Sequence, residues 1–326
     1  MLWEVFANND SEHPSYLFGT YHGNGIKGDF TDSIPGLSKA FNSVTQYIGE
    51  SNFSLLDSEE MQGFYRKWLG EISMPVDTSY KILLNKTDYE YVDFLVRFHL
   101  RMFMDRKHIA PNYLSLWLVI MMQEDHMQNV FDRRKVVTVD EYLQYVAVKK
   151  GYTVKRLDSP EIKAEVMKFR YGDIPFPKTS FKEGADSLVA VAKKLDLILS
   201  DKFPKEIIDC VMNLENAYRA QDIKQFVRYQ YKLYELNGKF EEKCGGASLW
   251  SINEVSQDSF IIMGRNNLWI DKITGYMAER PSFIGVGVNH LFGEKGLISL
   301  LRKQGYKVKP IRESKMKKGV SIVKIR

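Results

Sequence analysis

Two short segments near opposite ends of this 326-residue chain share one pattern, and this pattern constrains the fold more than any other feature. Residues 14–22 read Pro-Ser-Tyr-Leu-Phe-Gly-Thr-Tyr-His, and residues 281–290 read Pro-Ser-Phe-Ile-Gly-Val-Gly-Val-Asn-His. Each is an apolar run of strand length that leads into a Gly-x-x-His sequence, ending at His22 or His290. The repeated pattern predicts an α/β fold with a mixed central sheet built from two duplicated strand–loop–helix halves.

The sequence around both segments supports this prediction. In the first half, strands are expected over residues 2–6, 15–19 and 46–50, with a helix over 35–43. In the closing half, a strand over 282–286 is followed by a helix over 295–303 and a strand over 306–311. Residues 135–139 and 152–157 predict two more strands, joined by a helix from Glu141 to Lys150 that Asp140 caps, which makes a βαβ unit.

The rest of the chain has helical periodicity. Helices are expected within residues 58–134 and 160–250 and over 251–273, with breaks near Ala220, at Gly238 and around Gly275. The segment 58–134 is rich in Met and aromatic residues, which favours a packed helical core over a groove for an apolar ligand. We therefore predict one domain over residues 1–326. Its α/β core comprises 1–57, 135–178 and 279–326, and 58–134 and 179–278 form mainly helical insertions.

Charge is concentrated at the end of the chain. The net charge is +5, but residues 307–326 alone carry eight Lys or Arg against the single acid Glu313, so the remainder is slightly acidic. This basic segment alternates like a strand and contains no interleaved aromatic residues. A solvated edge hairpin is therefore expected there, with lysines that protect the sheet edge, and no nucleic-acid partner is expected.

The sequence contains no candidate for a membrane span. The longest apolar run, Leu114 to Met122, is shorter than the roughly 20 residues that a spanning helix needs. A signal peptide is not expected either, because Glu4 interrupts any apolar segment after Met1. The chain as given is therefore expected to be soluble.

Two cysteines occur, Cys210 and Cys244, without a Cys-x-x-Cys motif, which argues against a thiolate zinc site. If the helix before Asn237 turns back at Gly238, the two thiols fall at similar heights in neighbouring helices. A Cys210–Cys244 disulfide is then one interpretation, and two separate buried thiols are the favoured one.

Three side chains are the candidates for chemistry. His22, Glu50 and His290 each follow a predicted strand, and ligand sites of open α/β sheets gather at the carboxyl ends of strands. Two imidazoles and a carboxylate suit a divalent transition metal that keeps open positions for water and substrate. Gly19 and Gly287 would permit close backbone approaches that a side chain prevents. The alternative is that each histidine only hydrogen-bonds a neighbouring carbonyl; the paired context favours a functional site.

Several motifs closely resemble those of the TraB/PrgY/GumN family of bacterial proteins. They are residues 2–5 (Leu-Trp-Glu-Val), 14–22, 48–50 (Ile-Gly-Glu), 265–266 (Arg-Asn), 287–293 and 305–308, and their order and spacing match over nearly the whole chain. This family is related to the Tiki metalloproteases and, more distantly, to erythromycin-esterase-like and ChaN-like proteins. The resemblance implies an α/β core with paired Gly-x-x-His motifs.

The resemblance also implies roles for individual residues. His22, His290 and Glu50 would be metal ligands or acid–base groups, and Arg265 and Asn266 would orient substrate or stabilise an oxyanion. A guanidinium suits that task, but Arg265 could equally form an ion pair that holds a ligand carboxylate. Asp158 stands where bacterial members usually have Glu, so we expect it to fix a histidine tautomer rather than to touch the metal.

The leading hypothesis is therefore a metal-dependent, Tiki-like hydrolase of peptides or small esters. By resemblance its cofactor would be Mn²⁺ or Co²⁺, with Zn²⁺ as a further candidate. The alternatives are a non-catalytic module that binds a peptide or small ligand and a metal-independent esterase. Family members are often exported, and Leu2 matches the usual start of their mature domain, so a periplasmic or cell-surface protein with its leader removed is expected.

Overall fold

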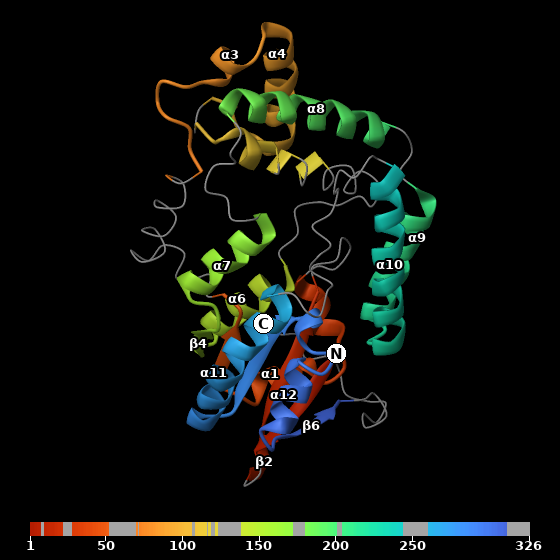
Figure 1. Ribbon diagram of the computed structural model, residues 1–326. Coiled ribbons are helices and arrows are strands. Elements are labelled where there is room, and N and C mark those ends of the chain that lie inside the picture. Colours follow the sequence, from red (N-terminus) through yellow and green to blue (C-terminus); the bar gives the residue numbers. More distant parts are fainter. Residues whose placement is uncertain are drawn as a thin grey trace.

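A computed structural model describes residues 1–7, 10–21, 28–51, 70, 72–105, 108–115, 117–118, 121–122, 138–171, 180–200, 204–243 and 260–311. Its centre is a six-stranded sheet in the order β4-β3-β5-β2-β1-β6 (Figure 1). The strands are β1 (Leu2–Ala7), β2 (Asp10–Thr20), β3 (Gln46–Gly49), β4 (Thr153–Arg156), β5 (Ser282–Gly287) and β6 (Lys307–Pro310). The expected α/β fold with a mixed sheet is confirmed.

The sheet is mixed, with four parallel strands and two antiparallel pairings at one side. The four strands β4, β3, β5 and β2 are mutually parallel, whereas β1 runs antiparallel to both β2 and the edge strand β6. All four residues of β3 are buried, as are the first five of β5, because the sheet is covered on both faces. Apart from Gln46 and Ser282 at their starts, β3 and β5 consist of apolar residues and glycine, which is typical of such central parallel strands.

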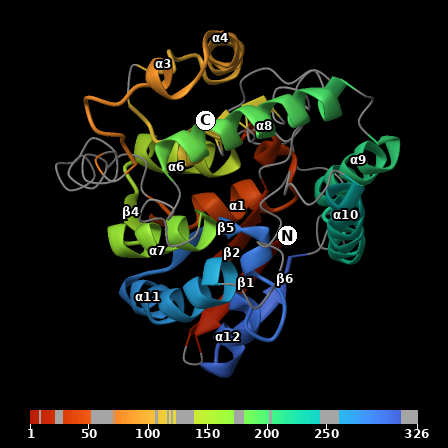
Figure 2. The same ribbon diagram turned by 45° about the horizontal axis from the view of Figure 1, so that its top comes forward.

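Helices cover both faces of the sheet (Figure 2). One face packs against α1 (Leu37–Asn42) and α6 (Val139–Lys149), and the other against α11 (Arg265–Glu279) and α12 (Leu297–Lys303). Right-handed crossovers produce this division, because the chain moves along the sheet in one direction from β2 to β4 and then returns to β5. The chain after β2 therefore continues to α1 on one face, and the chain after the neighbouring strand β5 continues to α12 on the other.

A second hydrophobic core lies in the helical part. It joins α3 (Tyr80–Leu83), α4 (Lys86–Leu95), a π-helical turn (Val96–Leu100) and α8 (Phe181–Ser200). The described residues of segment 58–134 thus contribute to a packed core, the favoured alternative. Helix α7 (Pro160–Tyr171) follows β4. Among the described helices none is both long and apolar enough to cross a membrane.

The hairpin of α9 (Lys205–Arg219) and α10 (Ile223–Lys243) belongs to the sheet core instead. Its side chains Leu214, Tyr218 and Phe226 are buried within that core. The described structure also contains 3-10 helices at Gly28–Ser33 and Val288–His290 and a π-helical turn at Phe260–Gly264 before α11. The proposed domain boundaries and the internal duplication remain predictions.

Three expected boundaries were wrong. Val139 was assigned to a strand and Asp140 to a cap, but α6 begins at Val139 and Thr138 caps it in a capping box with Glu141; residues 135–137 lie outside the described ranges. Helix α10 continues through the expected break at Gly238, and α11 continues through Gly275 to Glu279. A helical glycine costs only about 1 kcal/mol, which burial of the remaining helix face exceeds.

Candidate functional site

The sheet brings the two Gly-x-x-His segments to the same edge. In the parallel pair of β2 and β5, Gly19 is opposite Val286 and Thr20 is opposite Gly287, so the motif glycines differ by one residue in register. Strand β3 lies on the other side of β5 and ends at Gly49, directly before Glu50. The carboxyl ends of β2, β5 and β3 thus meet at one edge, which is the position where open α/β sheets bind ligands. His22 itself lies outside the described residues.

Both glycines make room for this arrangement. A Cβ atom on Gly19 would lie 2.6 Å from Cδ1 of Leu291 and 3.1 Å from the Cα atom of Val288, in the loop of the other motif. A Cβ atom on Gly287 would lie 3.2 Å from Oε1 of Glu50. The motif glycines thus allow close approach between the two loops and between β5 and the carboxylate.

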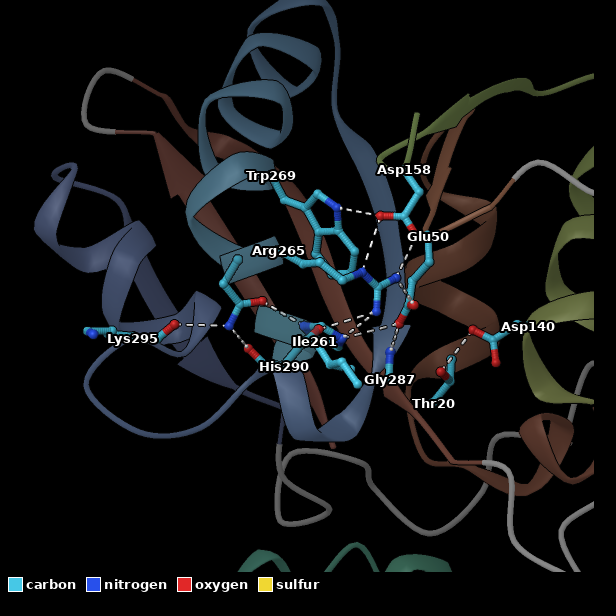
Figure 3. Close-up of polar contacts among 11 residues, drawn as sticks. Thr20, Glu50, Asp140, Asp158, Ile261, Arg265, Trp269, Gly287, His290 and Lys295 are labelled. Carbon is cyan, nitrogen blue, oxygen red and sulfur yellow. Dashed lines mark hydrogen bonds and ion pairs between the residues drawn. The ribbon is translucent and has the colours of Figure 1, made fainter. Parts of the chain in front are cut away.

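Glu50 is held as an ionised carboxylate (Figure 3). Its Oε1 atom accepts a hydrogen bond from the backbone N–H of Gly287 at 2.7 Å, and its Oε2 atom accepts one from Nη2 of Arg265 at 2.6 Å. Burial alone would raise the pKa of Glu50, but Arg265, His290 and the Gly287 N–H together lower it to about 2. The side chain keeps 25% exposure and is thereby accessible from solvent.

Arg265, the first residue of α11, joins two carboxylates. Its Nε atom donates to Oδ1 of Asp158 at 3.2 Å, and its Nη2 atom donates to Oδ2 of Asp158 and to Glu50, each at 2.6 Å. Trp269, one turn later, lies against the guanidinium at 4.3 Å and donates from Nε1 to Asp158 at 2.9 Å. The Arg265 side chain is only 7% exposed, so this geometry matches the ion-pair alternative rather than a group free to bind substrate.

Asn266 defines the protonation pattern of His290. The amide nitrogen of Asn266 donates to two carbonyl oxygens, of His290 at 3.1 Å and of Lys295 at 2.9 Å, so its Oδ1 atom must face the imidazole. Oδ1 lies 2.7 Å from Nδ1 of His290 and can only accept, which places the imidazole proton on Nδ1. Nε2 of neutral His290 therefore carries a lone pair, and Nη1 of Arg265 lies 3.3 Å from it.

His290 is neutral at physiological pH. Burial lowers its pKa to about 4; the positive charge of Arg265 acts in the same direction, and Glu50 opposes it. Nε2 of His290 lies 3.8 Å from Oε1 of Glu50, too far for a direct hydrogen bond. A neutral imidazole nitrogen and an ionised carboxylate oxygen thus face each other across a short gap.

The donor atoms of His290 and Glu50 suit a divalent metal ion. Metal–ligand bonds to nitrogen and oxygen are about 2.1 Å long, so one divalent ion can contact two donors that are 3.8 Å apart. Within the described ranges no group of three or more His, Cys, Asp or Glu side chains could hold a metal ion. His290 and Glu50 fit two ligand positions, and the third predicted ligand, His22, is outside those ranges.

The α9–α10 hairpin contacts both motifs. The hydroxyl group of Tyr218 donates to the carbonyl oxygen of Gly19 at 2.8 Å, and Nε2 of Gln230 donates to Oδ1 of Asn289 at 2.5 Å. One helical hairpin is thus hydrogen-bonded to the end of β2 and to the turn after β5. The Thr20 hydroxyl also donates to Oδ1 of Asp140, at the start of α6, at 2.8 Å.

Comparison with known proteins gives the chain a family. A family model described as TraB/PrgY/gumN family matches residues 1–310. The chain belongs to this family. Neither the search of curated proteins nor the search of solved structures gave a match.

Membership in the TraB/PrgY/gumN family agrees with the motifs that the sequence singled out. Of the predicted site residues, the structure brings together Glu50, Asp158, Arg265, Asn266 and His290. The Cys210 thiol is buried, forms no disulfide within the described residues, and donates a hydrogen bond to the Tyr229 carbonyl oxygen. Cys244 lies outside the described residues, so the Cys210–Cys244 disulfide is untested. Helix α10 continues through Gly238, where the turn on which this pairing depended was expected.

Sequence reasoning missed four side chains of this family member's site: Trp269, Tyr218, Gln230 and Asp140. Trp269 had a usable signal, because it follows Arg265 by four residues on a predicted helix and so shares its face. Tyr218 and Gln230 had none, since their contacts depend on how a distant hairpin docks on the sheet.

Proposed function

We propose that this TraB/PrgY/gumN-family protein is a metal-dependent hydrolase of the Tiki-like kind that cleaves a peptide or small ester. The observation that carries the proposal is the lone pair of neutral His290 facing ionised Glu50 across 3.8 Å at the carboxyl ends of β2 and β5. The parallel pairing of these strands also supports two related halves that each end in Gly-x-x-His.

In this proposal His290, Glu50 and His22 would hold Mn²⁺, Co²⁺ or Zn²⁺. A divalent ion bound there would lower the pKa of a water molecule and polarise the scissile carbonyl. Glu50 acts as a ligand rather than as the general base, because a carboxylate whose pKa is about 2 accepts a proton poorly near neutral pH.

The surrounding residues orient this pair. Asn266 keeps the proton of His290 on Nδ1, a common arrangement for metal-binding imidazoles. Arg265 keeps Glu50 ionised and fixes its position, and Asp158 and Trp269 in turn hold Arg265. Arg265 therefore acts as a positioning residue in this proposal, not as the group that stabilises an oxyanion.

One observation favours the metal-independent esterase as a second candidate. Nη1 of Arg265 lies 3.3 Å from Nε2 of His290, and a guanidinium there competes with a cation for the same lone pair. In the esterase, neutral His290 would instead accept a proton from water or substrate.

Turnover separates the proposals. Chelator-stripped protein would be assayed on mixed peptides and on aryl esters, with and without added Mn²⁺, Co²⁺ or Zn²⁺. We expect hydrolysis only with metal, its loss in His290→Ala and Glu50→Gln, and its retention in His13→Ala, which changes an exposed histidine of β2. Metal-free hydrolysis that needs His290 would establish the esterase, and ligand binding without turnover would establish the binding module.

A further inference from the structure

Several exposed apolar side chains lie in one helical segment, residues 72–105. Of the eleven large apolar side chains most exposed in the described structure, five lie within residues 72–105. Three of these are Phe94 (58% exposed), Phe98 (50%) and Phe103 (56%). They lie on α4 and just after it, at the end of the molecule opposite to β6 and α12 (Figure 1).

Two arginines lie against these phenylalanines. The rings of Phe94 and Phe98 stack, with centroids 6.1 Å apart and planes inclined by 21°. The guanidinium of Arg101 lies 5.3 Å from the Phe98 centroid, and that of Arg97 lies 5.9 Å from the Phe103 centroid. We name these five side chains the α4 tip. Phe94, Phe98 and Arg101 thus form one contact group, and Phe103 and Arg97 form a second group in the same segment.

The acids around the α4 tip are already engaged. Asp93 forms an ion pair with Arg97 at 2.7 Å, and its own side chain is only 10% exposed. Asp105 accepts hydrogen bonds from the backbone N–H of Tyr80 and from the Tyr89 hydroxyl. The sequence over residues 93–107 carries four Lys or Arg and two acids, Asp93 and Asp105, so its net charge is still positive.

The backbone at the α4 tip is irregular in a way that costs free energy. Residues Val96–Leu100 wind as a π-helical turn, and Arg101 then adopts a left-handed conformation with φ of 55°. Non-glycine residues seldom adopt this conformation, and π-helical turns occur frequently at functional positions. The irregular turn presents Phe98 and Arg101 to solvent instead of continuing α4.

We propose that the α4 tip docks on an anionic lipid surface. Its phenylalanine rings would enter the headgroup region, while Arg101 would contact lipid phosphates; Arg97 is already paired with Asp93. Aromatic rings flanked by arginines suit this boundary, because one part of the surface is apolar and the other attracts anionic headgroups. The tip lies at an outer end of the molecule, so it suits an extended partner (Figure 1). This inference is independent of the proposed hydrolase.

Vesicle flotation tests the inference with the full chain. We expect the protein to float with vesicles of equal phosphatidylcholine and phosphatidylglycerol, and to float much less with phosphatidylcholine alone or at high salt. Arg101→Gln should weaken binding about fivefold, and Arg97→Gln should weaken it less, because Arg97 is paired with Asp93. Phe98→Ser combined with Phe103→Ser should abolish flotation and leave the circular dichroism spectrum unchanged, since both rings are half-exposed.

A matched control comes from α10. Tyr231 and Tyr234 are exposed to a similar degree (56% and 49%), and serine at both positions should leave vesicle binding unchanged. Wild-type protein that fails to float with anionic vesicles would overturn the inference, as would equal flotation of the Phe98→Ser/Phe103→Ser variant. A concentration-dependent dimer that this variant abolishes, without vesicle binding, would also overturn it and make the tip a contact between copies.

Discussion

At the scale of the residue, Arg265 is the cation that pairs with both acids of the site, Glu50 and Asp158. Arg265→Met removes the cation and leaves both acids unpaired, and Asp158 is only 5% exposed. We expect the free energy of unfolding to fall by about 3–5 kcal/mol in chemical denaturation. Lys193→Met is the control, because Lys193 pairs with Asp88 at the surface and should cost about 1 kcal/mol or less.

A small loss in Arg265→Met, equal to that of the control, would contradict this account of the site. It would mean that Glu50 and Asp158 find other partners or become protonated without penalty. The double variant Arg265→Met/Asp158→Asn should recover part of the lost stability, since it removes one of the two unpaired charges.

His290 should make stability depend on pH. Its pKa is about 4 in the folded protein and 6.5 when unperturbed, so the unfolded chain binds more protons between these values. The contribution of His290 is therefore complete above pH 6.5 and is lost as pH falls toward 4. For chelator-treated protein we expect the free energy of unfolding to drop by on the order of 2 kcal/mol between pH 7 and 5, measured by urea titration.

The same titration on His290→Gln isolates this contribution. The variant lacks the titrating group, so its stability should change clearly less over this interval. Glu50 does not interfere, because its pKa is lowered from 4.5 to about 2, so its own contribution is lost between these values, below the interval from pH 7 to 5. Equal pH dependence in both proteins would show that His290 is not buried in its neutral form.

At the scale of the element, the α9–α10 hairpin is hydrogen-bonded to the end of β2 and to the turn after β5. Tyr218→Phe removes the hydrogen bond to the Gly19 carbonyl and leaves that buried oxygen unpaired. We expect a loss of about 1–3 kcal/mol in the free energy of unfolding and faster amide hydrogen exchange in residues 19–21. Tyr231→Phe, on the exposed side of α10, should change neither, and protection that stays unchanged in Tyr218→Phe would refute this role of the hairpin.

The elements also show where local sequence signals end. Gly238 and Gly275 resemble helix stops, yet both lie within helices, because buried positions such as Trp269 and Ile273 fix α11 more strongly than one glycine weakens it. Val139 fits a strand run locally, but the capping box of Thr138 and Glu141 starts α6 there. Residue patterns placed all six strands, but β2 begins at Asp10, five residues before its expected start at Ser15.

At the scale of the whole molecule, the repeated Gly-x-x-His pattern predicted that distant ends of the chain share one site, and β2 and β5 are indeed neighbours. Glu50 and His290 were identified from their positions at or just after the carboxyl ends of predicted strands, whereas Arg265 was identified only through a family motif. The sequence could not predict that Arg265 joins Glu50 to Asp158, because that geometry depends on how α11 crosses the sheet. The contacts of Tyr218 and Gln230 depend on tertiary docking in the same way.

The most direct test of the account is a calorimetric titration of Mn²⁺, Co²⁺ and Zn²⁺ into chelator-stripped protein. We predict binding of one ion per chain, lost in His290→Ala, strongly weakened in Glu50→Gln, and unchanged in His13→Ala. His290 and Glu50 supply two donors at 3.8 Å, which one ion can join. Absence of binding in the wild type, or binding that His290→Ala leaves intact, would contradict the metal centre on which the proposed hydrolase depends.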